Sequence, residues 1–592
     1  MSLLGSIVSG LLGIIGSLTQ QQTNGASVWG TLQAPVFPQF LTNNPLPAGF
    51  PWGTLTAAGS NPYTSAPNTG VTRNYDFTVT RGTIAPDGYQ VSVLLVNGAF
   101  PGPQIEANWG DTIQVTVHNQ ITGPTEGTTF HWHGMLQKGT EYADGVPAVS
   151  QCPIAPGSSF TYTFKASLYG TSWYHSHYSA QYSGGLLGPM IIHGPHENFN
   201  YDIDLGPVFL QDWYHTPYLQ IVEEVMKSNG NPRPNSDNNL INGKMDFNCS
   251  TKAAGDNTPC NSNAGLSRFK FTTGKTHRLR LINAGSAGLQ RFSIDGHNMT
   301  VIANDYVPVQ PYTTQVVTLG IGQRTDVLVT ANAGTSTSAF WMRSNISTLC
   351  SEANQPNALA AIYYTNADTS KAPTSQAWNI PDPGTCANDD LSLTVPMFPL
   401  NAATPSSTQN LDINYYVNST GSFLWTLGGV SFRADYNAPV LLQAESGNLT
   451  FDPEANVQNF GTNSTVRIVV NNPTPASHPM HIHGHNMQIL HEGSGNWDGT
   501  SIVNPSNPQR RDTQLVRANG HFVMQYSLDN PGIWPFHCHI AWHVSGGLYA
   551  NMMELPGQIK TETNLPSIMS QTCTNWMKYT NSNEPDQYDS GV

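Results

Sequence analysis

Four His-x-His pairs are the residues of this sequence whose type and spacing most clearly suggest chemistry. They are His131/His133, His175/His177, His481/His483 and His537/His539. Residues two apart in a β-strand point to the same face, so each pair can present two imidazoles side by side. One pair alone is weak evidence, because solvated and structural histidines are common. Four pairs together predict eight imidazoles that converge on a metal cluster.

Cys538 stands between two of these histidines, in the run His537-Cys538-His539. In a strand its thiol points away from the face that the two histidines share. Together with His478 and His543 it forms a His₂Cys set, which is typical of a blue-copper electron-transfer site. Zinc is the alternative metal, but structural zinc sites usually carry more cysteines in CxxC spacing. The backbone of the run would connect the two metal sites for electron transfer.

The elements that position these residues are predicted to be strands. Short alternating apolar runs, broken by Gly, Pro and Asn, indicate an all-β fold. Strands are predicted at 112–117, 160–164, 278–282, 326–329 and 466–470. The main helix is predicted at 218–227.

A strand-plus-loop pattern occurs three times in the chain, beginning at Gly110, Gly274 and Asn463. The first and third copies lead to a His-x-His-Gly motif, whereas the middle copy keeps one histidine, His297. We therefore predict three β-sandwich domains at 70–196, 197–380 and 381–592, after an N-terminal extension at 1–69. The metal cluster is expected between the first and last domains, because both supply histidines.

Composition excludes several classes of protein. The 592 residues include 24 Lys+Arg and 38 Asp+Glu, which gives a formal charge of −14. This acidic balance argues against nucleic acid or an anionic membrane as partner. The composition also excludes disorder, collagen and a multi-span membrane protein. An apolar stretch at 3–18 is either a signal segment or part of the mature N-terminus.

Cysteines and glycosylation sequons favour a secreted, extracellular glycoprotein. Six cysteines remain besides Cys538, and they allow 15 pairings. We prefer two short loops and one long-range link, with free thiols as the alternative: Cys249–Cys260, Cys350–Cys386 and Cys152–Cys573. Sequons occur at Asn248, Asn298, Asn345, Asn418, Asn448 and Asn463.

The histidine motifs resemble those of the multicopper oxidases, and most closely the laccases of ascomycete fungi. The resemblance runs from about residue 70 to the end. It rests on His-Trp-His-Gly, Trp-Tyr-His-Ser-His, His-Pro-Met-His-Ile-His-Gly-His and His-Cys-His-Ile-Ala-Trp-His-Val-Ser-Gly-Gly-Leu. It implies three consecutive cupredoxin-like Greek-key domains and four copper ions.

The resemblance also assigns the ligands. Type 1 copper would take His478, Cys538 and His543, and type 2 copper would take His131 and His481. The two type 3 ions would take His133, His175 and His539, and His177, His483 and His537. The axial type 1 position falls on Leu548, which has no donor atom and therefore implies a raised reduction potential. The remaining motif histidine, His485, is expected to be structural, as are His118, His193, His215, His297 and His521.

The implied activity is that of a laccase. A phenol or aromatic amine would give single electrons at the edge of His543, Cys538 would pass them on, and O₂ would be reduced to water at the trinuclear cluster. Asp144 matches an acidic residue that relays protons in relatives. The alternatives are an oxidase dedicated to a pigment precursor or a metal ion, and a non-catalytic copper electron carrier. We expect a monomer, and lignin degradation is one role open to it.

Two further segments bear on this activity. Relatives often place a carboxylate for the phenol shortly after the strand equivalent to 278–282, but residues 283–287 contain no acid here. The last four residues, Asp589 to Val592, resemble a processed tail that enters the channel to the trinuclear site in relatives.

Overall fold

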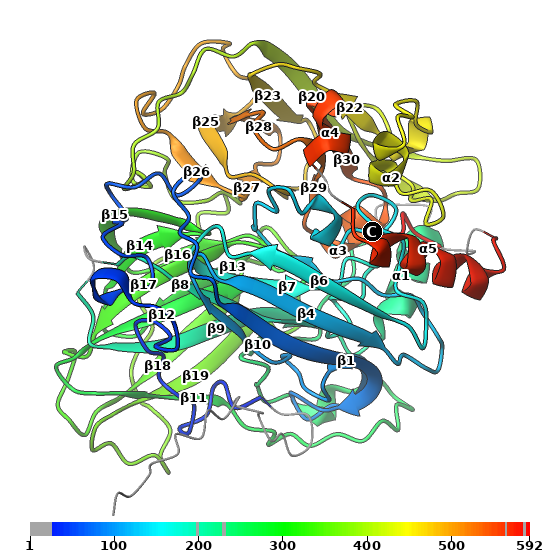
Figure 1. Cartoon of the computed structure of the whole chain (residues 1–592). Helices are drawn as coiled ribbons and strands as arrows, with labels where there is room; N and C mark the ends of the chain where they lie inside the picture. Colours follow the sequence, from blue (N-terminus) through cyan, green and yellow to red (C-terminus); the bar gives the residue numbers. More distant parts are fainter. Residues whose placement is uncertain (1–26, 197–199, 228–232, 563–564, 584–587) are drawn as a thin grey trace, which may run out of the picture.

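The computed structural model describes residues 27–196, 200–227, 233–562, 565–583 and 588–592. The apolar stretch at 3–18 lies outside the described residues. The strands form six β-sheets, which pair into three β-sandwich units that follow one another along the chain (Figure 1). The predicted all-β fold is therefore confirmed. We call these pairs the first, second and third units.

The first unit contains two four-stranded sheets. One consists of β2 (Val91–Val96), β1 (Thr72–Ile84), β4 (Thr112–Asn119) and β6 (Ser159–Lys165). The other consists of β3 (Ile105–Asn108), β8 (Leu187–His193), β7 (Gly170–His175) and β5 (His131–Trp132).

The second unit contains a six-stranded and a five-stranded sheet. The larger consists of β10 (Asn238–Ile241), β9 (Ile203–Trp213), β12 (Thr276–Asn283), β17 (Arg324–Thr330), β14 (Met299–Asn304) and β15 (Val307–Thr314). The smaller consists of β11 (Ser267–Phe271), β19 (Asn357–Tyr364), β18 (Ala339–Ile346), β13 (Gln290–Ile294) and β16 (Val317–Leu319).

The third unit has the same sheet sizes as the second. Its larger sheet consists of β21 (Phe423–Leu427), β20 (Ser407–Val417), β23 (Thr465–Asn472), β28 (Gly520–Ser527), β25 (Met487–Ser494) and β26 (Gln509–Arg511). Its smaller sheet consists of β22 (Val457–Asn459), β30 (Tyr549–Glu554), β29 (Gly532–Cys538), β24 (His478–Ile482) and β27 (Thr513–Val516).

A shared strand pattern relates the three units. Each sheet contains one parallel pair among antiparallel neighbours. These pairs are β1 with β4 and β3 with β8, β9 with β12 and β11 with β19, and β20 with β23 and β22 with β30. All five predicted strands lie inside observed strands: β4, β6, β12, β17 and β23. The repeat read from the sequence is therefore a structural repeat.

Burial differs between the outer and inner sheets of the units. In β4 buried and partly exposed residues alternate, as expected for a sheet with one face toward solvent. Every residue of β7, β24 and β29 is buried, because the sheets of the first and third units that carry them face each other. Those three strands hold five of the predicted metal ligands: His175, His478, His481, His537 and Cys538.

Helices are few and lie in the connections. The predicted helix is observed as α1 (Tyr218–Lys227), with the same bounds. The others are α2 (Val440–Glu445), α3 (Ala541–Ser545), α4 (Pro556–Glu562) and α5 (Ser567–Thr580), and single 3₁₀ turns lie at Pro47–Gly49, Glu141–Ala143, Cys249–Thr251 and Pro453–Ala455. The C-terminal helix α5 was not predicted. Its sequence is rich in Ser and Thr, which are weak helix formers, so the pattern gave little helical signal.

Three disulfides link the cysteines in the pairs preferred from the sequence. Cys249 bonds Cys260 and Cys350 bonds Cys386, both within or beside the second unit. Cys152 bonds Cys573 and so ties α5 to the first unit. The remaining cysteine, Cys538, is free and buried.

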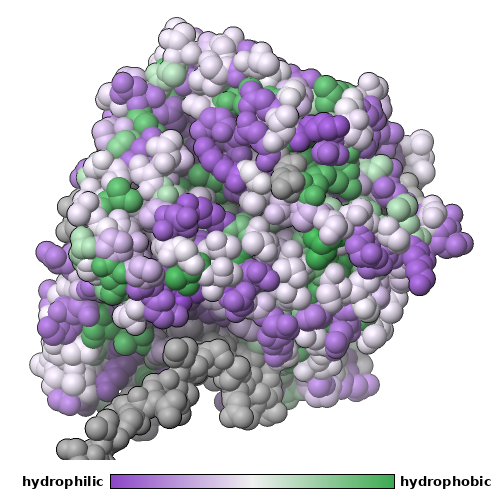
Figure 2. Space-filling model, viewed as in Figure 1, coloured by the Kyte–Doolittle hydropathy of each residue, from purple (hydrophilic) through white to green (hydrophobic). Residues whose placement is uncertain are grey.

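The described part of the N-terminal extension packs on the first and second units. Phe37 forms a β-bridge with Asp204 of β9, and Arg73 donates to Asn43 and to buried Asp111. None of the described helices is long and apolar enough to cross a membrane. The face seen in Figure 2 is largely hydrophilic, with hydrophobic residues scattered over it.

Candidate metal centre

Two strand pairs hold the His-x-His motifs at equivalent places in the first and third units. β5 pairs antiparallel with β7, which sets His131 opposite His175. β24 pairs antiparallel with β29, which sets His481 opposite His537. Side chains opposite each other on one face of a sheet lie close together, and the ring centroids of these couples are 5.4 and 5.6 Å apart. The strand register therefore delivers the imidazoles in couples.

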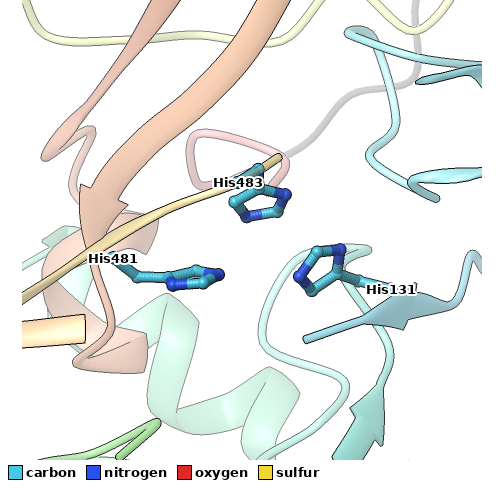
Figure 3. Close-up of side chains that lie close together, drawn as sticks. All are labelled: His131, His481 and His483. Carbon is cyan, nitrogen blue, oxygen red and sulfur yellow. The ribbon is translucent and has the colours of Figure 1, made fainter. Parts of the chain in front are cut away.

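The two sets of imidazoles meet between the units. His131 of the first unit faces His481 and His483 of the third (Figure 3), and one ligand nitrogen from each of the three lies within 4.8 Å of the others. The ring of His131 is 3.9 Å from that of His483 between centroids. All eight histidines of the four pairs are buried. The predicted convergence of the pairs is therefore present in the structure.

Several of these rings have a buried nitrogen without a hydrogen-bond partner. These atoms are Nε2 of His131, His175 and His481, Nδ1 of His133 and His177, and both ring nitrogens of His539. In addition, Nε2 of His537 lies 3.0 Å from Nε2 of His483 and 3.4 Å from Nε2 of His177. Buried polar atoms normally have partners. Metal ions between the rings would supply them, so the residues fit a metal cluster.

Backbone carbonyls orient the other nitrogen of four rings. Nδ1 of His131 donates to the carbonyl of Asp144, and Nδ1 of His481 donates to that of Asp512. Nδ1 of His175 and Nδ1 of His537 each donate to the carbonyl of the following residue. A carbonyl only accepts, so the proton lies on Nδ1 and Nε2 is left as the free donor atom for a metal.

Burial keeps the imidazoles neutral. It lowers the pKa well below the ordinary value for His133, His175, His177, His478, His483, His537 and His539. Burial also lowers the pKa of His543 to about 3, and the positive charge of Arg233 acts in the same direction. Neutral imidazole is the form that binds metals. These histidines are therefore available as neutral ligands near neutral pH.

The His₂Cys set lies on the other side of β29. Nδ1 of His478 is 3.0 Å from Nδ1 of His543, and Sγ of Cys538 is 3.7 Å from the first and 3.6 Å from the second. Burial raises the pKa of the Cys538 thiol, whereas a bound cation would favour the thiolate. The three converging atoms have the donor types of a copper site. Leu548 is fully buried in the core cluster that contains Cys538.

The structure also groups the histidines predicted for the cluster. His177, His483 and His537 form one potential metal group, and His131 and His481 share another. His133, His175 and His539 have mutually adjacent rings, with centroids 5.0–5.7 Å apart. The assignment of individual copper ions to these groups stays a prediction.

Two buried carboxylates flank the cluster. Asp144, which the sequence singled out, lies 2.7 Å by its Oδ2 from Nδ1 of His483 and 3.2 Å by its Oδ1 from Nδ1 of His131. Asp512 was missed. Its Oδ1 accepts a hydrogen bond from Nε2 of His133 at 3.0 Å. The signal was the charged run Arg510-Arg511-Asp512, which the structure buries completely.

A second missed carboxylate lies near the His₂Cys site. The loop 283–287 has no acid of its own, but Asp212 of β9 accepts hydrogen bonds from the backbone N–H groups of Ser286 and Ala287. The hydroxyl of Tyr214 also donates to Asp212 and accepts from Nε1 of Trp542, the neighbour of His543. The loop therefore has no acid of its own, as its sequence shows, and a different strand supplies the carboxylate that it contacts. One acid at the end of an apolar strand was the available signal.

His543, a predicted ligand that is partly exposed, and the C-terminal tail mark two approaches to the centre. The indole of Trp425 lies 4.5 Å from the ring of His543. Val592 is buried and lines a small cavity with His175, His177, His537 and His539. The tail is fixed by hydrogen bonds from Ser590 Oγ to the Val544 carbonyl and from Tyr436 OH to the Gly591 carbonyl.

The histidines expected to be structural have protein partners. His193 contacts Glu106, His215 contacts Asp87, and His485 contacts Glu554. His118 lies beside Ser159, His297 beside Tyr364, and His521 beside the Gly495 carbonyl.

Known proteins share this fold and these motifs. Three multicopper oxidase family models match residues 78–197, 204–367 and 427–558. "Oxidoreductase OpS5" of Beauveria bassiana is 42% identical over 91% of each chain, and "Laccase-2" of Botryotinia fuckeliana is 39% identical over 91% of this chain and 92% of its own. The crystal structure of a laccase from Botrytis aclada superposes with a TM-score of 0.83 at 37% identity, covering 91% of this chain and 98% of the other.

The chain therefore belongs to the multicopper oxidases. Its three units are cupredoxin-like domains, as the resemblance implied. Membership makes it a copper-binding oxidoreductase.

Proposed function

We propose that the protein is a laccase, which oxidises phenols and aromatic amines one electron at a time and reduces O₂ to water. The observation that carries the proposal is the set of eight buried imidazoles joined to a His₂Cys site by the run His537-Cys538-His539. Relatives named laccase support it. A protein that only carried electrons would need the His₂Cys site alone.

We propose four copper ions in this centre, held as the resemblance assigns them. One would lie at His478, Cys538 and His543, and one at His131 and His481. The remaining two would lie at His133, His175 and His539, and at His177, His483 and His537. When bound, these ions supply one-electron oxidation of the substrate and four-electron reduction of O₂.

The protein's own residues bind the substrate and move protons. The exposed edge of His543, beside Trp425, is the proposed contact for the aromatic ring. Asp212 is the proposed acceptor of the phenolic proton, because it is the carboxylate hydrogen-bonded to the adjacent loop. Asp144 would hand protons toward O₂ from its place against His131 and His483.

We also propose that the protein is a secreted monomeric glycoprotein. The three disulfides support an oxidising compartment. None of the six sequon asparagines is buried: Asn248, Asn298, Asn345, Asn418, Asn448 and Asn463.

Oxygen uptake tests the proposal directly. The purified copper-loaded protein should be blue and should consume O₂ with a simple phenol. Cys538→Ser should abolish both the colour and phenol oxidation while retaining copper at the cluster. Blue protein that consumes no O₂ with any phenol or aromatic amine would contradict the proposal.

A dedicated oxidase of a pigment precursor or a metal ion is the second candidate. The relative OpS5, at 42% identity, is named an oxidoreductase rather than a laccase. Steady-state rates over phenols, a non-phenolic dye, ascorbate and Fe(II) distinguish the two, since a dedicated enzyme would favour one compound strongly.

A further inference from the structure

The second unit supplies none of the predicted copper ligands, yet it reaches the cluster through Arg324. This residue begins β17 and is fully buried. Its Nη1 and Nη2 donate to Oδ1 and Oδ2 of Asp512, each at 2.7 Å. A bidentate Arg–carboxylate pair fixes both partners in one geometry. Arg324 therefore sets the position of Asp512.

Asp512 in turn holds two imidazoles of the cluster. Its side chain accepts from Nε2 of His133 at 3.0 Å, and its backbone carbonyl accepts from Nδ1 of His481 at 3.0 Å. The two rings stack, with centroids 3.8 Å apart. Asp512 therefore links Arg324 of the second unit to His133 of the first unit and His481 of the third by hydrogen bonds.

Charge at this junction is balanced by a second ion pair. Arg511 donates to both oxygens of Asp305, at 3.0 and 3.1 Å. Asp305 also accepts from the backbone N–H groups of Arg324 and Asp512. Two guanidinium groups thus face two carboxylates in the buried junction. The negative charge of the two carboxylates is balanced by the two guanidinium groups. The histidines therefore need not be protonated, and they remain free to act as ligands.

Two glycines show how closely the three units approach here. Gly134, which ends His-x-His-Gly, has a φ of +80°, and a Cβ there would lie 2.5 Å from Oδ2 of Asp512 and 2.7 Å from Nη2 of Arg324. Gly322 of the second unit has a φ of +86°, and a Cβ there would lie 2.9 Å from Cδ2 of His539. Both positions therefore require the absence of a side chain.

We propose that Arg324 is a positioning residue of the copper cluster, through which the second unit orients His133 and His481 by way of Asp512. The inference rests on the proposed copper cluster. Groups that orient metal-binding histidines typically change metal affinity 10–100-fold when altered. Arg324 is expected to act on the cluster and not on the His₂Cys site.

The test is Arg324→Lys, with Arg343→Lys as the matched control. Lysine keeps the charge but loses the bidentate fork. Arg343 makes the same kind of pair with buried Asp295 in the second unit, at 2.7 and 2.9 Å. Unlike Asp512, Asp295 makes no hydrogen bond to a cluster histidine in the described part of the chain. Both variants should lose thermal stability. Only Arg324→Lys should lose cluster copper to a chelator, because its affinity for that copper should fall roughly 10–100-fold. It should also alter the type 2 electron paramagnetic resonance signal. The blue colour of the His₂Cys site should not change.

A milder variant keeps the test decisive if Arg324→Lys fails to fold. Arg511→Lys perturbs the outer ion pair and should shift copper affinity in the same direction by a smaller factor. Cluster copper affinity and resonance signal equal to wild type in the folded variants of Arg324 and Arg511 would overturn the inference. Wild-type protein that holds no cluster copper would instead refute the proposed function.

Discussion

At the scale of single residues, two buried aspartates, Asp512 and Asp212, differ in what stabilises their charge. Burial raises the pKa of Asp512, but the Arg324 guanidinium opposes this and holds the pKa well below the usual range. Asp212 has N–H and O–H donors instead of a guanidinium, and burial raises its pKa above the usual value. Asp512 is thus suited to orient histidines, and Asp212 to exchange a proton.

The raised pKa of Asp212 predicts the pH dependence of phenol oxidation. A carboxylate that accepts the phenolic proton must be ionised, so kcat/KM should rise as pH increases through this raised pKa. Asp212→Asn should remove that rise and lower the rate with phenols about 10²-fold or more. A non-phenolic dye, which releases no proton, should be oxidised by both proteins at similar rates. Equal loss with dye and phenol would indicate damage to the copper site instead.

Sequence spacing predicted the histidines and Cys538 but not these acids. The ligands lie in repeated short motifs, whose strand periodicity places them on one face. Asp512 acquires its role from Arg324, and Asp212 acquires its role from the loop at Ser286, so both depend on partners far away along the chain. Only the fold brings these pairs together.

At the scale of elements, the C-terminal helix shows how a tertiary bond can replace helix propensity. The helix α5 is polar along most of its length, but Trp576 is fully buried and Cys573 is bonded to Cys152 of the first unit. Strands and α1 were predictable because their apolar periodicity is strong. The helix α5 was not, because its stability comes from contacts with a segment 421 residues earlier.

Removal of this disulfide should release the helix. The double variant Cys152→Ser/Cys573→Ser is expected to lose about 2–5 kcal/mol of stability, because the long loop is no longer closed in the unfolded chain. Calorimetry should report a lower Tm, and limited proteolysis should cut within α5. The matched variant Cys249→Ser/Cys260→Ser opens a loop with a separation of 11 residues and should cost less. Equal losses in both variants would count against this account.

At the scale of the whole molecule, the proposed copper ions would hold the first and third units together and so stabilise the folded protein. Their ligands come from both units, and the free ring nitrogens face one another across the interface. A ligand that binds only the folded state raises the free energy of unfolding, and it does so more when it binds more tightly.

Copper removal should therefore lower the Tm of the whole protein. Differential scanning calorimetry of chelator-treated protein should show an earlier transition, and reloading with copper should restore the original one. The Cys538→Ser protein lacks only the blue site. Its Tm should fall less below the wild-type value than the Tm of copper-free protein does, because the cluster still joins the units. Identical transitions with and without copper would contradict this stabilising role.

The order in which the chain is synthesised gives the split ligand set another consequence. His131 belongs to an early strand, whereas His537 and His539 lie near the C-terminus. A nascent chain can fold its first sandwich while it is still on the ribosome, but it then offers only half of the cluster's imidazoles. Metal insertion into the cluster is therefore expected to follow synthesis of the third unit.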